Sequence, residues 1–247
     1  MYYADRFEVL PGGKKHATPP LTPQYDAIAD LPAIPVLAET LLRMELEVRG
    51  SATDLRAFTE AVLADVGATI QILRLAGQEF PVAADSPARV EDCISELGPR
   101  TCLEAAAKGS FVGMHTHTAR QFWVHAEDVA QYFKLFAGLG APGITPDQAY
   151  LTGLLHALGA LPAVLGWGHV GLDGDAAQVA LALAEQWRFP RFVIDFFGEV
   201  LLPGHCPAWA KFVTVAHHPA KESWLECPLA AAQNLSLRRV GRAAIQK

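Results

Sequence analysis

Histidine is the residue type in this chain whose positions are most suited to chemistry. The 247-residue sequence contains nine histidines, and an imidazole can bind a metal ion or transfer a proton near neutral pH. His125 follows Trp123 and Val124, and His156 lies within the apolar run Leu154-Leu155-His156-Ala157-Leu158. Taken singly, each position is more typical of a hydrogen-bonded histidine in or beside a core than of a metal ligand.

Other residues that could do chemistry lack the spacing that known sites need. The sequence contains no glycine-rich phosphate loop, no Gly-x-Ser-x-Gly elbow and no His-Glu-x-x-His motif. His115 and His117 form a His-x-His pair just before an expected helix, where a solvated loop is favoured over a metal site. No two of the four cysteines form a Cys-x-x-Cys pair, which indicates small core residues in a reducing compartment.

The composition excludes several classes of protein. With 51% hydrophobic and 19% charged residues, the chain is expected to fold around a large core without disulfides. The absence of a long apolar run or of a signal-peptide pattern predicts a cytoplasmic protein that does not enter a membrane. A net charge of -6 argues against binding of nucleic acid.

The elements that must position the histidines are predicted to be helices, so the fold class is all-α. Residues 1–30 contain frequent prolines and glycines, and we interpret them as an irregular arm before a helical domain at residues 31–247. A helix is expected over 54–66, with Ser51 or Thr53 as its N-cap. Gly67 should interrupt it before a short second helix that ends near Gly77.

The two helices that carry His125 and His156 have the clearest sequence signals. Apolar residues at helical spacing predict a long helix from about Thr118 to Ala137. The sequence Thr145-Pro146-Asp147-Gln148 has the pattern of a capping box and predicts the start of a leucine-rich helix. Pro162 should kink or end that helix.

Segments in a fixed order along the chain resemble the HDOD domain family. They run from Leu31 to Ala216 and include LPAIP (31–35), DVGATIQILRLA (65–76), VEDCISELGPR (90–100), WVH (123–125), LTGLLHALG (151–159) and WRFP (187–190). The resemblance implies a multi-helix bundle in two helical halves, derived from the HD hydrolase superfamily. It also implies a role in bacterial signal transduction.

The resemblance implies which residues would form a metal site. Active superfamily members bind divalent metal through a first His, a His-Asp doublet and a later Asp, and these positions match His125, His156-Ala157 and His217 of this chain. Ala157 lacks the carboxylate that hard cations need. We therefore expect no catalytic residue and no cofactor, and we interpret His125, His156 and His217 as vestigial. If they converged, three neutral imidazoles could still hold zinc or nickel.

The leading functional hypothesis is a non-catalytic output or regulatory domain that acts through protein–protein contact. Its partners would be other signalling proteins in trans, or a second copy of this chain. One alternative is a metal-dependent phosphohydrolase with altered ligands that acts on a nucleotide or cyclic dinucleotide. A second alternative is a small-molecule sensor that uses the vacated cleft near His125 and His156.

Overall fold

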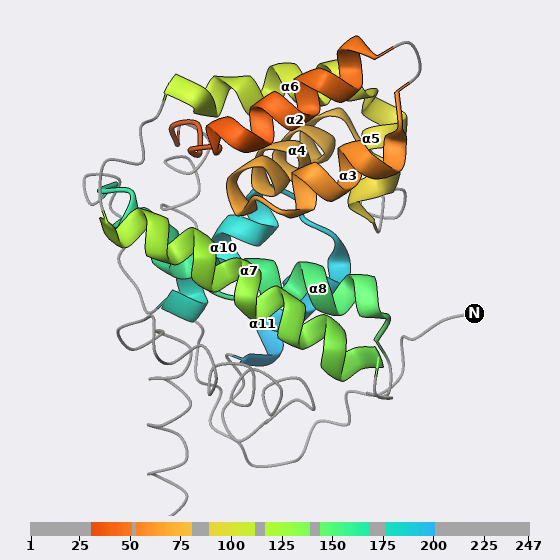
Figure 1. Cartoon of the computed structure of the whole chain (residues 1–247). Coiled ribbons are helices and arrows are strands. Elements are labelled where there is room, and N and C mark those ends of the chain that lie inside the picture. The colour runs from red at the N-terminus through yellow and green to blue at the C-terminus, as the bar shows by residue number, and fades with distance from the viewer. Residues whose placement is uncertain are drawn as a thin grey trace, which may run out of the picture.

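In a computed structural model, the described parts of the chain are helices joined by short segments (Figure 1). The structure describes residues 31–50, 53–80, 89–111, 117–138, 144–167 and 176–200, and these ranges contain no strand. The all-α prediction is confirmed. No helix in these ranges is long and apolar enough to cross a membrane. The predicted arm at 1–30 and the helices predicted beyond residue 200 lie outside the described residues.

The helices form two halves, one above the other in Figure 1. The first half contains α2 (Ala38–Arg49), α3 (Leu55–Leu63), α4 (Val66–Glu79), α5 (Val90–Leu97), α6 (Pro99–Ala107) and the 3-10 turn η1 (Lys108–Phe111). The second contains α7 (His117–Gly138), α8 (Pro146–Leu155), the 3-10 turn η2 (Leu158–Ala160), α9 (Leu161–Val164), α10 (Ala176–Gln186) and α11 (Arg191–Val200). The predicted two-half bundle is therefore confirmed.

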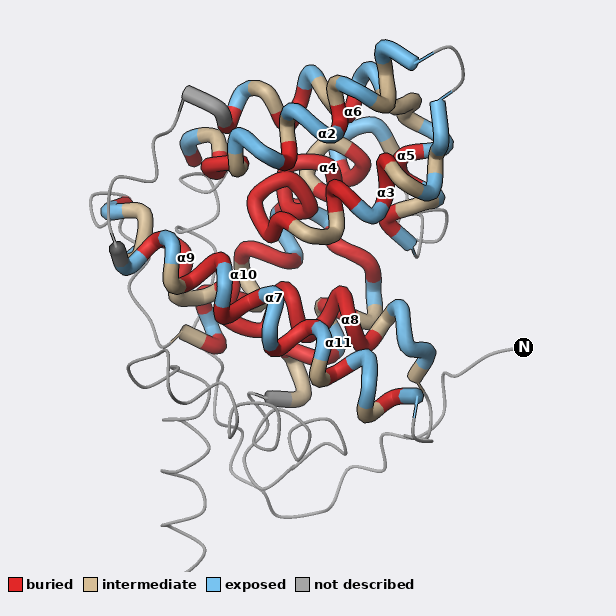
Figure 2. The backbone as a smooth tube through the Cα atoms, in the orientation of Figure 1, coloured by how far each residue is buried: buried red, intermediate tan, exposed pale blue. Residues whose placement is uncertain are grey.

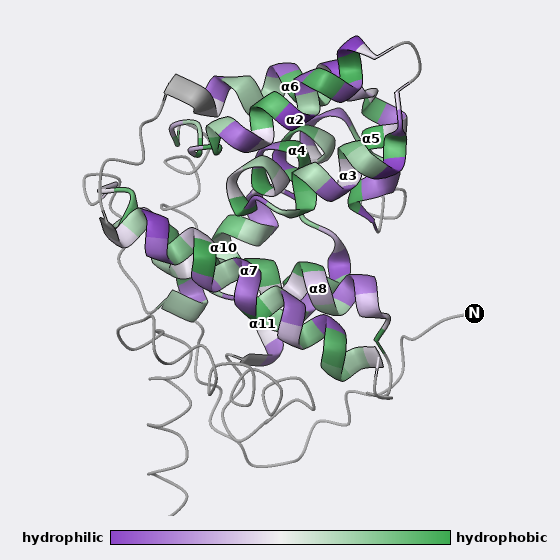
Figure 3. Cartoon of the chain, in the orientation of Figure 1, coloured by the Kyte–Doolittle hydropathy of each residue, from purple (hydrophilic) through white to green (hydrophobic). Residues whose placement is uncertain are grey.

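Each half is organised around apolar helix faces. In the first half, α4 is buried along most of its length and packs against α3, α5 and α6 (Figure 2). In the second half, α7 packs along α8 and presents Phe122, Val129 and Phe133 to the core. Hydrophobic and hydrophilic residues alternate along α7 (Figure 3), as expected for a helix with one buried face.

The predicted bounds of α7 and the predicted capping box at the start of α8 are confirmed, with the ends of α7 within one residue. The long helix runs from His117 to Gly138. Thr145 caps α8 as predicted: its hydroxyl accepts from the backbone N–H of Gln148 at 3.2 Å, and its own N–H donates to the Gln148 side chain at 3.1 Å. This reciprocal capping box fixes where the second of these helices begins.

Two predictions about helix ends were wrong. Helix α8 ends at Leu155, well before Pro162, and Pro162 lies in the first turn of α9, where its missing N–H leaves no hydrogen bond unmade. The N-cap of α3 is Asp54, whose carboxylate accepts from the backbone N–H groups of Arg56 and Ala57, and not Ser51 or Thr53.

Gly67 does not interrupt a helix but lies in the first turn of α4, which begins at Val66. A β-carbon at position 67 would overlap the carbonyl oxygen of Pro35 and would lie 3.1 Å from the Trp123 ring. Glycine is therefore required by the close approach of the segment before α2. This requirement depends on residues distant in the sequence, so helical periodicity could not reveal it.

We predict that Gly67→Ala lowers the free energy of unfolding by about 3 kcal/mol, because the new methyl group has no space beside Pro35. Urea denaturation followed by circular dichroism measures this. Gly138→Ala is the matched control, because no atom lies within 4 Å of a β-carbon there, and stability should change by less than about 1 kcal/mol. Equal effects of the two substitutions would contradict the proposed close approach.

Candidate functional site

The carboxylate of Asp65 joins three separate parts of the chain. One oxygen accepts from the backbone N–H of Leu37 at 2.7 Å. The other accepts from the backbone of Gly67 at 2.8 Å and of Ala68 at 3.2 Å, and from Nε1 of Trp123 at 2.9 Å. Asp65 is fully buried. It therefore caps α4 and holds both the segment before α2 and helix α7.

The surroundings of Asp65 identify it as a structural residue. Burial raises the pKa of its carboxyl group, and hydrogen bonds from Leu37, Trp123, Ala68 and Thr40 oppose that rise. Both oxygens are occupied by donors from the protein. A buried carboxylate held in this way is not free to act as a metal ligand.

Of the three histidines that the sequence singled out, the structure brings His125 and His156 together. His125 lies on α7 and His156 follows the last residue of α8. Both are buried, with 2% and 0% of their surface exposed. Their Nε2 atoms are 3.2 Å apart, and the rings meet edge to face. His217 lies outside the described residues, as does His115.

Close packing of α7 against α8 positions this pair. A β-carbon at Gly153 would lie 2.8 Å from the Cα atom of Ala130 and 3.0 Å from the side chain of Phe133, so glycine lets the two helices approach. Nδ1 of His156 is 2.6 Å from the carbonyl oxygen of the same Gly153. One residue thus sets both the spacing of the helices and the orientation of the His156 ring.

The hydrogen bonds assign a proton to each ring. A carbonyl oxygen only accepts, so Nδ1 of His156 must carry a hydrogen and donate it to Gly153. Nε2 of a neutral His156 is then an acceptor, and Nε2 of His125 must donate to it. With His156 neutral, the two imidazoles form a directly hydrogen-bonded pair in which Nε2 of His125 donates to Nε2 of His156.

The positions of His125 and His156 suit only part of the metal centre that the family resemblance implies. Two nitrogens bound to one zinc ion at about 2.1 Å with tetrahedral geometry lie about 3.4 Å apart, so the 3.2 Å separation suits two ligands of one ion. The next residue, Ala157, is buried and supplies only a methyl group. Among the described residues, no group of three or more His, Cys, Asp or Glu side chains could hold a metal. The described donors do not fit a two-metal hydrolytic site, which needs oxygen ligands.

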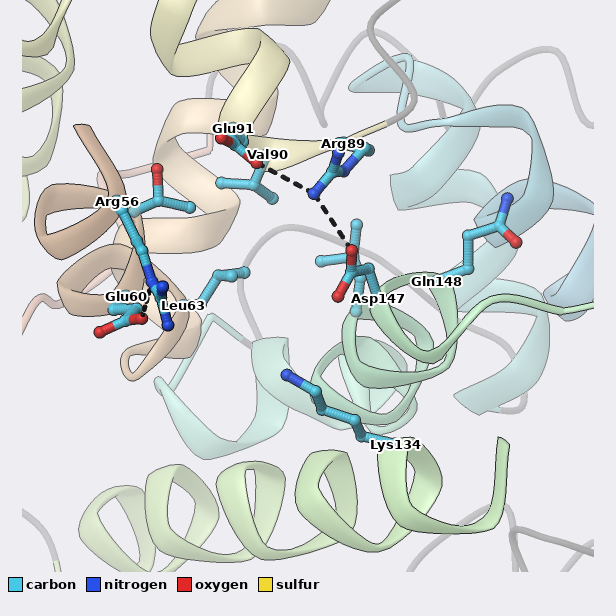
Figure 4. A pocket seen from close by; sticks show the side chains of 11 residues that line it. Arg56, Glu60, Leu63, Arg89, Val90, Glu91, Lys134, Asp147 and Gln148 are labelled. Carbon is cyan, nitrogen blue, oxygen red and sulfur yellow. Dashed lines mark hydrogen bonds and ion pairs between the residues drawn. The ribbon is translucent and has the colours of Figure 1, made fainter. Parts of the chain in front are cut away.

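A cavity of about 320 Å³ lies between the halves, away from the histidine pair (Figure 4). It is lined by charged side chains of α3, α7, α8 and the start of α5, and neither His125 nor His156 is among them. Arg89 lines the cavity and joins two of its other lining residues, with Nη2 2.9 Å from Glu91 and 3.1 Å from Asp147. The sensor hypothesis placed a ligand at the histidines, whereas this cavity lies at the junction of the halves.

Comparisons with known proteins agree with this architecture. The family model described as HDOD domain matches residues 34–166, more than half of the chain. Two crystal structures of the MmoQ response regulator from Methylococcus capsulatus str. Bath share the fold. One is 20% identical with a TM-score of 0.59 and covers 83% of this chain and 91% of that one. The other is 19% identical with a TM-score of 0.61 and covers 85% and 93%. No curated protein matches the sequence.

We predict that Asp65→Ala lowers the free energy of unfolding by about 4 kcal/mol, because four donors, three of them in buried hydrogen bonds, lose their acceptor. Asp54→Ala is the matched control: Asp54 also caps a helix through two backbone N–H groups but is exposed, so about 1 kcal/mol should be lost. Chemical denaturation compares the two variants. Similar losses would show that Asp65 does no more than cap α4.

We also predict the tautomers of the histidine pair. Long-range nitrogen–proton NMR spectra at neutral pH should show His156 protonated at Nδ1 and His125 protonated at Nε2. His156→Ala should remove the acceptor and shift the His125 signals. A His156 ring protonated at Nε2 would be incompatible with the bonds described above.

Proposed function

Because the chain belongs to the HDOD domain family, we propose that it is a non-catalytic signalling domain that acts by contact with other proteins. The observation that carries this proposal is the methyl group of Ala157 beside a pair of histidines that hydrogen-bond to each other. Where hydrolysis would need an anionic ligand and a bound water, this chain has two buried imidazoles in contact and a methyl group.

The physical requirements of phosphoester hydrolysis support the proposal. A hard divalent cation needs carboxylate oxygens, and it stabilises the attacking and leaving oxygens of the reaction when it is bound. Nε2 of His156 already accepts a hydrogen bond from His125, so the lone pair a metal would use is engaged. The same hydrogen bond satisfies two buried polar atoms and therefore stabilises the junction of α7 and α8.

A signalling role agrees with the structural relatives. The protein whose crystal structures share this fold, MmoQ, is described as a response regulator. A domain without an active site can transmit a signal only by presenting a surface to a partner. We therefore propose that other signalling proteins in trans, or a second copy of the chain, are the binding partners.

One observation favours a second candidate, a metal site with altered ligands. The 3.2 Å separation of the two Nε2 atoms is close to that of two imidazoles on one zinc ion. His125 would have to move its proton to Nδ1, and a third ligand such as His217 would have to complete the site. A phosphohydrolase acting on a nucleotide or cyclic dinucleotide would follow from such a centre.

Metal content and hydrolysis distinguish the two candidates. We expect the full chain, purified without chelator, to contain less than about 0.1 equivalents of zinc, nickel, manganese or iron by mass spectrometry, because the described site offers two neutral donors. It should also fail to hydrolyse bis-p-nitrophenyl phosphate or cyclic dinucleotides when manganese or zinc is added.

His156→Ala is the matched variant for this experiment. Under the proposal, it changes neither metal content nor hydrolysis. Its only effect is a loss of stability of about 3 kcal/mol, since it leaves a cavity and removes a buried hydrogen bond. A stoichiometric metal that the His156→Ala variant lacks would overturn the proposal in favour of the altered metal site.

A further inference from the structure

Helix α2 presents an apolar stripe to solvent that no other described helix covers. Leu42 and Leu46 are one helical turn apart, and 58% and 62% of their surfaces are exposed. Thr40 and Met44, on the opposite side of the helix, are buried against the first half. Figure 1 shows α2 in front of α4, and no described helix covers it from this side. The two leucines form the centre of an open surface.

Four of the five charged residues of α2 are arranged symmetrically about Met44. Glu39 and Arg49 lie five residues before and after Met44, and Arg43 and Glu45 lie one residue before and after it. When a second α2 runs antiparallel to the first and the two are aligned at Met44, each of these four residues therefore lies opposite a residue of the other charge. Leu42 lies opposite Leu46 in the same alignment. The surface is thus self-complementary, which is the requirement of a two-fold symmetric interface.

We infer that α2 binds the α2 helix of a second copy of this chain in antiparallel orientation. Leu42 of each copy packs on Leu46 of the other, and Glu39 of each copy pairs with Arg49 of the other. On a helical wheel, Glu39 and Arg49 flank the leucine stripe at about 40° on either side. At an interaxial distance of about 9 Å, their β-carbons come within about 6 Å, which an ion pair spans.

Arg49 can make this contact without losing its present one. Its Nη2 atom is 2.5 Å from Glu45 in the same helix, and both side chains are exposed, at 76% and 43%. A guanidinium group has five N–H donors, so Arg49 can bind Glu45 and a second carboxylate together. A parallel arrangement would instead place Glu39 on Glu39 and Arg49 on Arg49. Charge therefore selects the antiparallel pairing.

The size of the surface sets the expected strength. A single pair of 12-residue helices buries less than the roughly 1,200 Å² of a standard stable interface. The dimer should therefore exchange with monomer, with a dissociation constant on the order of tens of micromolar. This inference is independent of the proposed signalling function, because it rests on α2 alone and not on the histidine site.

Sedimentation equilibrium of the full chain from about 5 to about 300 µM tests the interface, with charge reversals as probes. We expect Glu39→Arg and Arg49→Glu each to weaken self-association at least about tenfold. The antiparallel dimer has two contacts between position 39 of one copy and position 49 of the other, and each substitution puts like charges together at both. An equimolar mixture of the two variants should restore dimers. In the mixed dimer, the new basic side chain of one variant faces the new acidic side chain of the other, and the native Glu39 and Arg49 form the second pair. Circular dichroism verifies that each variant is folded.

Charge reversals on another exposed surface serve as controls. Arg120→Glu and Asp128→Arg lie on α7 in the second half and should leave the dissociation constant unchanged. The inference is overturned if the native chain stays monomeric across the range, if it dimerises equally well with either α2 reversal, or if the mixture of variants fails to recover dimers.

Discussion

The buried carboxylate of Asp65 is the contact on which both the fold and the site depend. It binds the segment before α2, the first turn of α4 and the indole of Trp123 on α7. Trp123 and His125 are two residues apart and so point about 200° apart on the helix. When Asp65 fixes Trp123 toward the first half, His125 must therefore face the interior of the second half, where it meets His156.

In the function proposed for this chain, the histidine pair keeps the position of a metal centre without its chemistry. Ala157 has no carboxylate to follow His156, and Nε2 of His125 and Nε2 of His156 share a hydrogen bond. Burying two neutral polar rings costs little when each is hydrogen-bonded, whereas burying an unpaired carboxylate costs much more. The proposed loss of catalysis is thus compatible with a stable core, and it leaves the outer surfaces of the helices to carry the function.

The parts of the structure that depend on neighbouring residues could be predicted from the sequence. The capping box at Thr145 and the long helix around Phe122 and Phe133 act within a few residues, and both are confirmed. Contacts between distant residues could not be predicted. Asp65 is 28 residues from Leu37 and 58 from Trp123, and the need for glycine at position 67 comes from Pro35. The pairing of His125 with His156 followed only from the family resemblance, and their tautomers required the geometry.

The state of the histidine pair when metal is abundant decides whether this chain keeps a metal centre. Crystals of the full chain grown with millimolar manganese or zinc would be measured at the absorption edge of the metal. We predict no anomalous peak between the rings and a retained contact of Nε2 of His125 with Nε2 of His156 near 3.2 Å. A strong anomalous peak within about 2.2 Å of both Nε2 atoms would contradict it and would identify a working metal site.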